Sequence, residues 1–188
     1  RIKKIRRCAD KVLCLLPFEP DLYKKHKIPA VFVGHPAANT LPYDLESSAV
    51  RNEFNLSSGT IIAILPGSRS SEIENLGPIF AGVAKLLIDR YKDISFVSPM
   101  PSLAIFNQFE KVLIDNNIRD SFTLIRGYSH EMIVASNLVL LASGTAALES
   151  ALLCRPTIAA YKVSMLSYFI LNKLIKIDSF TLPNILLN

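Results

Sequence analysis

Residues 141–150 read LASGTAALES, and here an apolar run ends at Ser143-Gly144-Thr145 and an alanine-rich helical pattern begins at once. The pattern predicts a buried strand, a tight turn and the start of a helix. A helix start carries unpaired backbone N–H groups and the positive end of the helix dipole, so small residues there let an anion approach closely. Glu149 follows Thr145 by one helical turn, on the same face. We expect this element to hold the diphosphate of a nucleotide sugar, with Glu149 on the ribose hydroxyls; the alternative is a solvent-facing glutamate.

From Thr60 onward, short apolar runs alternate with amphipathic stretches. The runs predict strands at 61–65, 94–98, 122–125, 138–142 and 157–161. Helices are predicted at 71–90, 102–116, 129–135 and 145–153, the first opened by a capping box of Ser71 with Glu74. Strands that are apolar throughout are buried on both faces, and helical crossovers between them imply a parallel sheet. The sequence therefore predicts a doubly wound, Rossmann-like α/β domain.

The first residues predict part of another domain. The tail of a basic helix over 1–10 precedes a strand at 12–16, a helix at 19–27 and a second strand at 30–33. Gly34 and two prolines make 34–42 more typical of a linker than of a regular element, and 43–58 is expected to be irregular or briefly helical. We predict an N-terminal portion over 1–36, a linker over 37–58 and a second domain over 59–188. Because the sequence opens without Met and closes on an apolar run, we expect a piece of a longer protein.

Composition narrows the class of protein. Twenty-one basic and 16 acidic residues give a net charge of +5, concentrated in residues 1–7 (RIKKIRR), which suit a solvated helix face or an anionic membrane surface. Nucleic acid is disfavoured because no second basic cluster with aromatic residues occurs. The three cysteines, Cys8, Cys14 and Cys154, lack a metal or disulfide spacing and predict reduced, buried thiols in a cytoplasmic protein. No membrane span is predicted, and the apolar helix expected over 164–177 is assigned to packing against another domain or to a membrane interface.

Ligands of parallel α/β sheets bind beyond the carboxyl ends of the strands, so the loops there are informative. After the strand at 61–65, Gly67 allows tight backbone geometry beside Ser68, and Arg69 is a candidate phosphate clamp. The alternative is a surface arginine that pairs with Glu72 or Glu74. After the strand at 122–125, Tyr128 is a candidate for lining a pocket for a flat base, or for ordinary loop packing. No P-loop, G-x-S-x-G or metal-ligand spacing is present.

Several motifs in order along the chain closely resemble lipid-A-disaccharide synthase. They are RIKKI (1–5), LLPFE (15–19), FVGHP (32–36), LPGSR with EI (65–69 and 72–73), ASGTAALE (142–149) and SFTLPN (179–184). The resemblance covers almost the whole chain. It implies a glycosyltransferase of the GT-B type, which has two Rossmann-like domains, and an inverting hexosyltransferase activity. Residues 1–36 would then end the N-terminal, acceptor-side domain, and residues 59–188 would form the donor-binding domain, truncated at its C-terminus.

The resemblance also implies substrates and residue roles. The family transfers 2,3-diacylglucosamine from its UDP donor to 2,3-diacylglucosamine 1-phosphate, which yields lipid A disaccharide and UDP without a metal or other cofactor. It implies that Arg69 contacts donor phosphate and stabilises the leaving group, and that Asn184 lies on the donor side of the cleft. Gly67, Ser68 and Tyr128 are candidate donor-binding residues because of their loops. Ser143, Gly144 and Thr145 then contact the diphosphate and Glu149 the ribose. Acylated substrates imply a peripheral enzyme on the cytoplasmic face of a Gram-negative inner membrane.

Departures from the family limit these expectations. The general base and most of the acceptor site of the family would precede Arg1, and the sequence stops before the family's final helices, so we expect this chain alone to be inactive. Near Met165 and Ser167 the family has proline and threonine. Two other interpretations stay open: a UDP-N-acetylglucosamine 2-epimerase-like enzyme, for which the loop at 34–42 lacks an acidic residue, and an inactive donor-binding remnant of a split gene.

Overall fold

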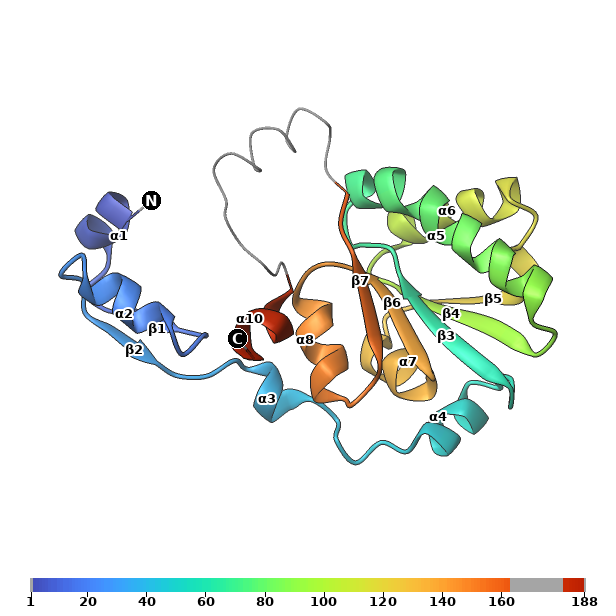
Figure 1. Cartoon of the computed structure of the whole chain (residues 1–188), viewed down its shortest axis with the longest axis horizontal. Coiled ribbons are helices and arrows are strands. Elements are labelled where there is room, and N and C mark those ends of the chain that lie inside the picture. Colours follow the sequence, from blue (N-terminus) through green and yellow to red (C-terminus); the bar gives the residue numbers. More distant parts are fainter. Residues whose placement is uncertain (1, 163–180, 188) are drawn as a thin grey trace. The chain divides into compact units, whose positions relative to one another are not determined.

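The computed structural model describes residues 2–162 and 181–187. The chain divides into two compact units, Arg1–Leu41 and Pro42–Asn188 (Figure 1). The predicted roles of these parts as acceptor-side and donor domains stay predictions at this point. The helix expected over 164–177 lies outside the described residues.

The first unit is small and built around two parallel strands. Its elements are α1 (Ile2–Cys8), β1 (Val12–Cys14), α2 (Glu19–Lys24), β2 (Ala30–Phe32) and α3 (Ala37–Thr40). Val12 lies opposite Ala30 and Cys14 opposite Phe32, so the predicted strand–helix–strand order is confirmed with shorter strands. The linker prediction missed α3. Pro36 fixes a helical φ at its start, and the Ala37 N–H donates to His35 Nδ1 at 3.2 Å, which together stabilise a single turn.

The second unit holds a five-stranded sheet. Its elements are α4 (Ser47–Glu53), β3 (Thr60–Leu65), α5 (Ser70–Arg90), β4 (Ile94–Met100), α6 (Leu103–Asp115), the 3-10 turn η1 (Arg119–Ser121), β5 (Phe122–Arg126), α7 (Ser129–Ala135), β6 (Leu138–Ala142), α8 (Thr145–Leu152), β7 (Thr157–Ala160) and α10 (Leu182–Leu187). The strand order is β5-β4-β3-β6-β7 and every pairing is parallel. The predicted α/β class and parallel sheet are therefore confirmed.

The helices cover the sheet on two sides. Helices α5 and α6 pack on one face, where both contact β4. On the other face, α7 contacts β3 and β4, and α8 contacts β6 and β7 (Figure 1). Right-handed crossovers produce this division, because the chain moves outward from β3 through β4 to β5 and then returns to β6 on the opposite side. The direction of winding thus reverses between β3 and β6, which are hydrogen-bonded neighbours in which Leu65 lies opposite Leu141.

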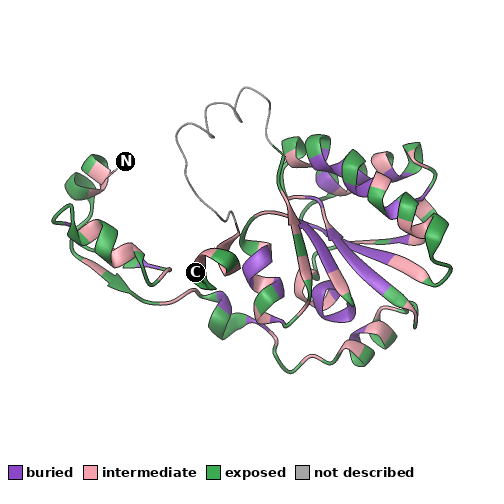
Figure 2. Ribbon diagram, in the orientation of Figure 1, coloured by how far each residue is buried: buried purple, intermediate pink, exposed green. Residues whose placement is uncertain are grey.

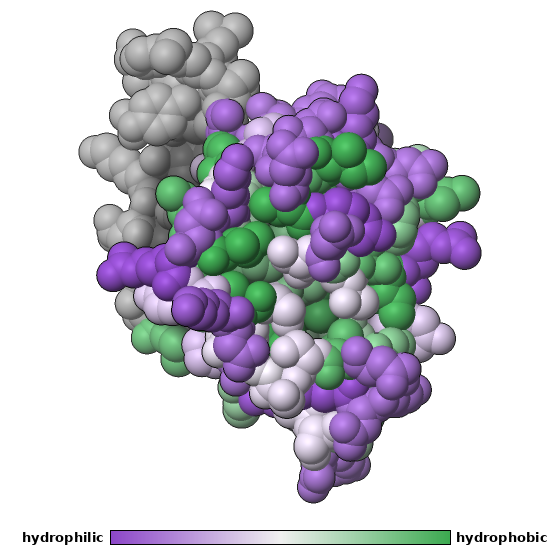
Figure 3. Space-filling model, turned by 90° about the vertical axis from the view of Figure 1, so that its right-hand side faces the viewer, coloured by the Kyte–Doolittle hydropathy of each residue, from purple (hydrophilic) through white to green (hydrophobic). Residues whose placement is uncertain are grey.

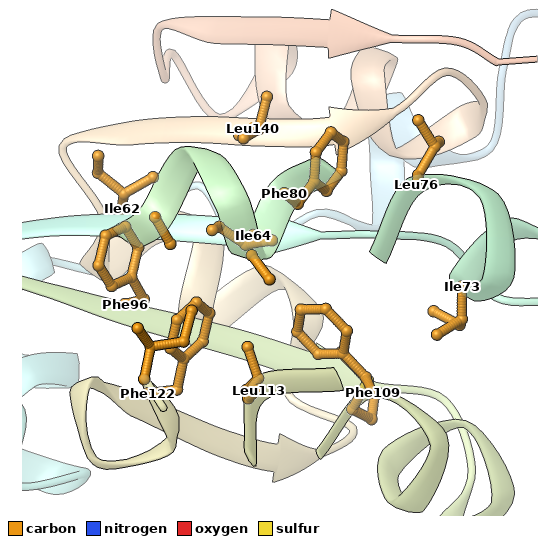
Figure 4. Packing of buried hydrophobic residues seen from close by; sticks show 14 of the residues in the cluster. Ile62, Ile64, Ile73, Leu76, Phe80, Phe96, Phe109, Leu113, Phe122 and Leu140 are labelled. Atoms are coloured by element: carbon orange, nitrogen blue, oxygen red, sulfur yellow. The ribbon is translucent and has the colours of Figure 1, made fainter. Parts of the chain in front are cut away.

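One large hydrophobic cluster of the core lies between the sheet and the helices α5 and α6. Phe80 and Ile73 of α5, Phe109 of α6 and Phe96 and Phe122 of the strands meet there (Figure 4). The rings of Phe96 and Phe122 stack at 4.8 Å between centroids, and Phe109 meets Phe122 edge-on at 6.1 Å. Buried residues follow the strands of this sheet closely (Figure 2), as expected for strands that are apolar on both faces.

The exposure of the cysteines departs from the prediction. Cys14 in β1 is buried, and this burial raises the pKa of its thiol. The nearby carboxylate of Glu19 raises the pKa further. Cys8 and Cys154 are exposed, so the prediction of buried thiols was wrong for both. Cys8 ends the exposed basic helix α1, and Cys154 stands at φ 55° in the turn that follows α8. Apolar neighbours in the sequence did not reveal that these positions end helices.

The face of the molecule in Figure 3 carries hydrophilic side chains around much of its rim and hydrophobic ones toward its middle. Ile79, Val83 and Leu86 of α5 are exposed apolar residues at helical spacing.

Among residues 2–162 and 181–187, no helix combines the length and the apolar composition that crossing a membrane requires.

Replacing Phe109 tests the assignment of the core. Phe109 is fully buried between α5, α6 and β5, so Phe109→Ala should lower the free energy of unfolding by about 3–5 kcal/mol, through lost burial and the cavity that remains. Ile114→Ala on the same helix removes a side chain that is 55% exposed and should change it by about 0.5 kcal/mol or less. Urea unfolding followed by circular dichroism measures both; equal effects would place the core elsewhere.

Candidate functional site

A cavity of about 460 Å³ lies within the second unit, at the carboxyl ends of the strands. Its lining comes from segments after β3, β4, β5 and β6: Leu65, Gly67, Ser68, Arg69, Glu72, Pro99, Met100, Pro101, Gly127, Ser129, Ala142, Ser143, Gly144, Thr145, Ala146 and Glu149. The cavity therefore opens where the direction of winding reverses, which is the usual ligand site of such sheets.

The loop between β3 and α5 is shaped around Glu72. One carboxylate oxygen of Glu72 accepts hydrogen bonds from the backbone N–H groups of Ser68 (2.7 Å) and Arg69 (3.2 Å). Gly67 stands at φ 136°, and a Cβ there would overlap Cβ of Glu72. A glycine is thus required both by the backbone conformation and by the close approach of Glu72.

The start of α5 differs from the predicted capping box. The helix begins at Ser70 with Arg69 at the N-cap, so Glu72, and not Glu74, occupies the position whose carboxylate reaches back to the cap N–H. The predicted pair of Ser71 with Glu74 is wrong by two residues. The loop enters the helix earlier than the sequence signal indicated, and Glu74 instead accepts a bond from Ser70 Oγ at 3.1 Å.

Arg69 lines the cavity while paired with Glu72. Its Nη1 lies 2.7 Å from Glu72 Oε1, and its side chain is 77% exposed. The surface pairing considered as an alternative from the sequence is therefore present, together with the position at the cavity. A guanidinium has several N–H donors in one plane, so a bond to Glu72 leaves others directed outward. Glu72 therefore balances the charge of Arg69 and orients its guanidinium group.

The turn Ser143-Gly144-Thr145 has the predicted strand–turn–helix geometry. Helix α8 begins at Thr145, and Gly144 is its N-cap in an extended conformation. The Ser143 N–H continues the sheet by donating to the Ala160 carbonyl at 3.0 Å. A Cβ on Gly144 would meet open space and not protein, so the glycine keeps the start of α8 accessible from the cavity. The first turn of an eight-residue helix thus presents its N–H groups there.

Glu149 lies on the face of α8 that lines the cavity, one turn after Thr145. Its side chain is 24% exposed, and its Oε2 lies 3.3 Å from His130 Nε2. His130 is the second residue of α7 and follows the third loop at this edge of the sheet. His130 was not among the site residues predicted from the sequence. The available signal was its position at a helix start directly after a strand that ends at the ligand edge.

Tyr128 and Asn184 lie outside the cavity lining. Tyr128 stands at φ 56° and packs edge-on against Phe54, with 5.1 Å between ring centroids, whereas its neighbours Gly127 and Ser129 do line the cavity. Asn184, in α10, lines a separate cavity of about 320 Å³ beside Arg155 and Thr157. The structure therefore gathers Gly67, Ser68, Arg69, Ser143, Gly144, Thr145 and Glu149, but not Tyr128 or Asn184.

Within the described part of the chain, no three His, Cys, Asp or Glu side chains converge in a way that could hold an ion. The polar groups of the cavity are backbone N–H groups, hydroxyls, one guanidinium and two carboxylates. This set is suited to an anion together with a polyol.

Comparison with known proteins yields one family over the full length. The family described as Lipid-A-disaccharide synthetase matches residues 1–188. Lipid-A-disaccharide synthases of Idiomarina loihiensis and Hahella chejuensis are 44% and 42% identical over 187 residues, 99% of this chain but 49% and 47% of their own lengths. The chain thus spans about half the length of the curated relatives it matches.

Solved structures share the fold at low identity. UDP-GlcNAc 2-epimerase from Neisseria meningitidis, solved bound to UDP-GlcNAc, superposes with a TM-score of 0.64 at 16% identity, over 95% of this chain and 52% of that protein. The predicted GT-B class, which groups such epimerases with glycosyltransferases, is confirmed at the level of the fold.

Gly67 offers a test of the loop that carries Arg69. Gly67→Ala should destabilise the protein by about 1–3 kcal/mol, because it combines an unfavourable φ with a clash against Glu72. Gly82→Ala is the matched control. Gly82 lies inside α5 with open space at its Cβ, so alanine should raise stability by about 0.5–1 kcal/mol. Urea unfolding reports both, and changes of the same sign would contradict the described loop.

Proposed function

The chain belongs to the lipid-A-disaccharide synthase family, and from this premise we propose that its second unit binds the UDP-activated sugar of a glycosyl transfer. The observation that carries the proposal is the cavity in which the start of α8, Arg69 and Glu149 converge. In the proposed reaction, 2,3-diacylglucosamine passes from its UDP donor to 2,3-diacylglucosamine 1-phosphate. The products are lipid A disaccharide and UDP.

The chemistry requires stabilisation of the leaving diphosphate. An acceptor hydroxyl gives its proton to a general base and attacks the anomeric carbon from the opposite side as the bond to the diphosphate oxygen breaks. UDP leaves with the electron pair, and the configuration inverts. Negative charge then grows on the diphosphate, where fixed N–H donors and a helix start are most effective. We assign this role to the first turn of α8 at Thr145 and Ala146, with Ser143 and Gly144 beside it. No metal or cofactor is expected.

Arg69 supplies the positive charge of the proposed site. It faces the same cavity from the loop after β3, so a diphosphate held at α8 would lie within one small volume with it. The Glu72 ion pair reduces its net charge but orients the guanidinium, and donors that do not face Glu72 can bind phosphate oxygen. Gly67 and Ser68 belong to the site because they let the Arg69 loop approach the cavity.

Glu149 is proposed to recognise the ribose. Its carboxylate accepts hydrogen bonds only, and two vicinal hydroxyl groups can donate to its two oxygens. It lies on the cavity-lining face of the helix that starts at the proposed diphosphate position. Tyr128, a candidate because of its loop, and Asn184, a candidate from the resemblance, lie outside this cavity and are assigned no contact within it.

The first unit carries an excess of positive charge, which suits an anionic membrane surface. Residues 1–41 hold nine of the 21 basic residues but three of the 16 acidic ones, a formal net charge of +6, so residues 42–188 carry −1. Lys3, Arg6, Arg7 and His26 line a shallow groove of about 190 Å³. We propose that this basic surface binds anionic headgroups, which would place a peripheral enzyme on the cytoplasmic face of the inner membrane beside its acylated substrates.

An epimerase activity is the second candidate, because the same fold occurs in UDP-GlcNAc 2-epimerase. The likeness to that enzyme is 16% in sequence, whereas the likeness to lipid-A-disaccharide synthases reaches 44%. We therefore favour glycosyl transfer. Binding of UDP is common to both candidates.

Glu149 gives the direct test of donor binding. Glu149→Ala should weaken UDP binding by about tenfold or more, or about 1.4 kcal/mol, because the ribose hydroxyls lose their acceptor. Isothermal titration calorimetry on the folded variant measures the change. Glu53→Ala, which removes an exposed carboxylate at the end of α4, should bind UDP as the wild type does. Unchanged affinity in Glu149→Ala would remove the ribose role.

The basic surface has its own test. Reversing the charges of Lys3, Lys4, Arg6 and Arg7 to glutamate should reduce sedimentation with vesicles that contain anionic lipid, and added salt should weaken wild-type binding. The control reverses an equal number of exposed cations in the second unit: Lys85, Arg90, Lys92 and Lys111. If both sets act alike, or if neither mutation nor salt has an effect, the first unit has no special role at the membrane.

A further inference from the structure

His130 links the two helices that follow β5 and β6. It is the second residue of α7, which follows β5, whereas its partner Glu149 lies on α8, which follows β6. The two helices pack against each other, and His130 Nε2 lies 3.3 Å from Glu149 Oε2. Glu149 lines the cavity and His130 does not, so His130 contacts a residue of the site without belonging to its lining.

The chemistry of the pair fixes the direction of the hydrogen bond. An ionised carboxylate only accepts, so Nε2 of His130 must carry the proton, in the neutral Nε2–H tautomer or in the imidazolium. The bond uses Oε2 and leaves Oε1 and further lone pairs of Glu149 for a ligand. It also restricts a side chain with several rotatable bonds, and that restriction lowers the entropy that ligand binding must remove.

We propose that His130 is a positioning residue, which holds the Glu149 carboxylate in the orientation that recognises the ribose of UDP. The inference rests on the proposed function, because it takes the ribose as the ligand of Glu149. It adds a residue of α7 that does not itself line the cavity to the set of residues that shape the site.

A brace between α7 and α8 is the competing role, and the two roles predict different results. The side chains of His130 and Glu149 are 36% and 24% exposed, so as a brace the pair would contribute little, on the scale of a partly screened surface ion pair. A brace would affect stability, and hence all ligands equally. A positioning residue affects only the ligand that bears the hydroxyl groups.

The test compares three ligands of one site by calorimetry: UDP, 2′-deoxy-UDP and inorganic diphosphate. Wild type should prefer UDP to 2′-deoxy-UDP. His130→Ala should weaken UDP binding by about threefold to tenfold, the scale of one net hydrogen bond, and should reduce the preference for UDP, with diphosphate affinity unchanged. His130→Gln, which keeps an N–H donor, should restore part of the preference. Glu131→Gln removes a charge from the same turn of α7 and should behave as wild type.

A double-mutant cycle completes the test. In a Glu149→Ala background, His130→Ala should have no further effect on UDP affinity, because its partner is gone. An unchanged preference for UDP in both His130 variants, or an equal loss for diphosphate, overturns the positioning role. If wild type binds no UDP, the proposed function fails and this inference falls with it. If wild type binds UDP but the variants keep its preference, the inference alone fails.

Discussion

The site depends on one constraint of chain geometry, the right-handed crossover between parallel strands. Because the chain winds outward from β3 and later returns to β6 beside it, the helices α5 and α8 leave neighbouring strand ends toward opposite faces of the sheet. The space between their first turns cannot be filled by either helix. The cavity lined by Arg69 and Glu149 is that space, so its position follows from the order of the strands.

The groups that line this cavity are of two kinds, hydrogen-bond donors that suit an anion and a carboxylate that suits hydroxyl groups. Backbone N–H groups at the start of α8 and the guanidinium of Arg69 suit an anion, while Glu149 at the far end of the first turn suits hydroxyl donors. Each carboxylate near the cavity has a cationic or N–H partner: Glu72 meets Arg69 and the loop backbone, and Glu149 meets His130. The partners set the direction of side chains that would otherwise rotate freely.

The positions of the strands and of the ligand-binding loops could be predicted from the sequence better than the contacts between side chains could. Solid apolar runs such as residues 61–65 and 138–142 read as buried strands because both of their faces are covered, and the loops after them were recognised as the ligand edge. Contacts across the fold have no local signal. The edge-on contact of Tyr128 with Phe54 and the approach of His130 to Glu149 depend on how helices pack. The capping box lies two residues earlier than predicted because α5 begins at Ser70, which places Glu72 at the capping position.

The central claim is that the cavity between β3 and β6 holds UDP. A crystal structure of this chain with UDP tests it most directly. The diphosphate should lie within hydrogen-bonding distance of the Thr145 and Ala146 N–H groups and of Arg69, and both ribose hydroxyls should donate to Glu149. UDP bound outside this cavity, or bound in it with the ribose turned away from Glu149, would contradict the account.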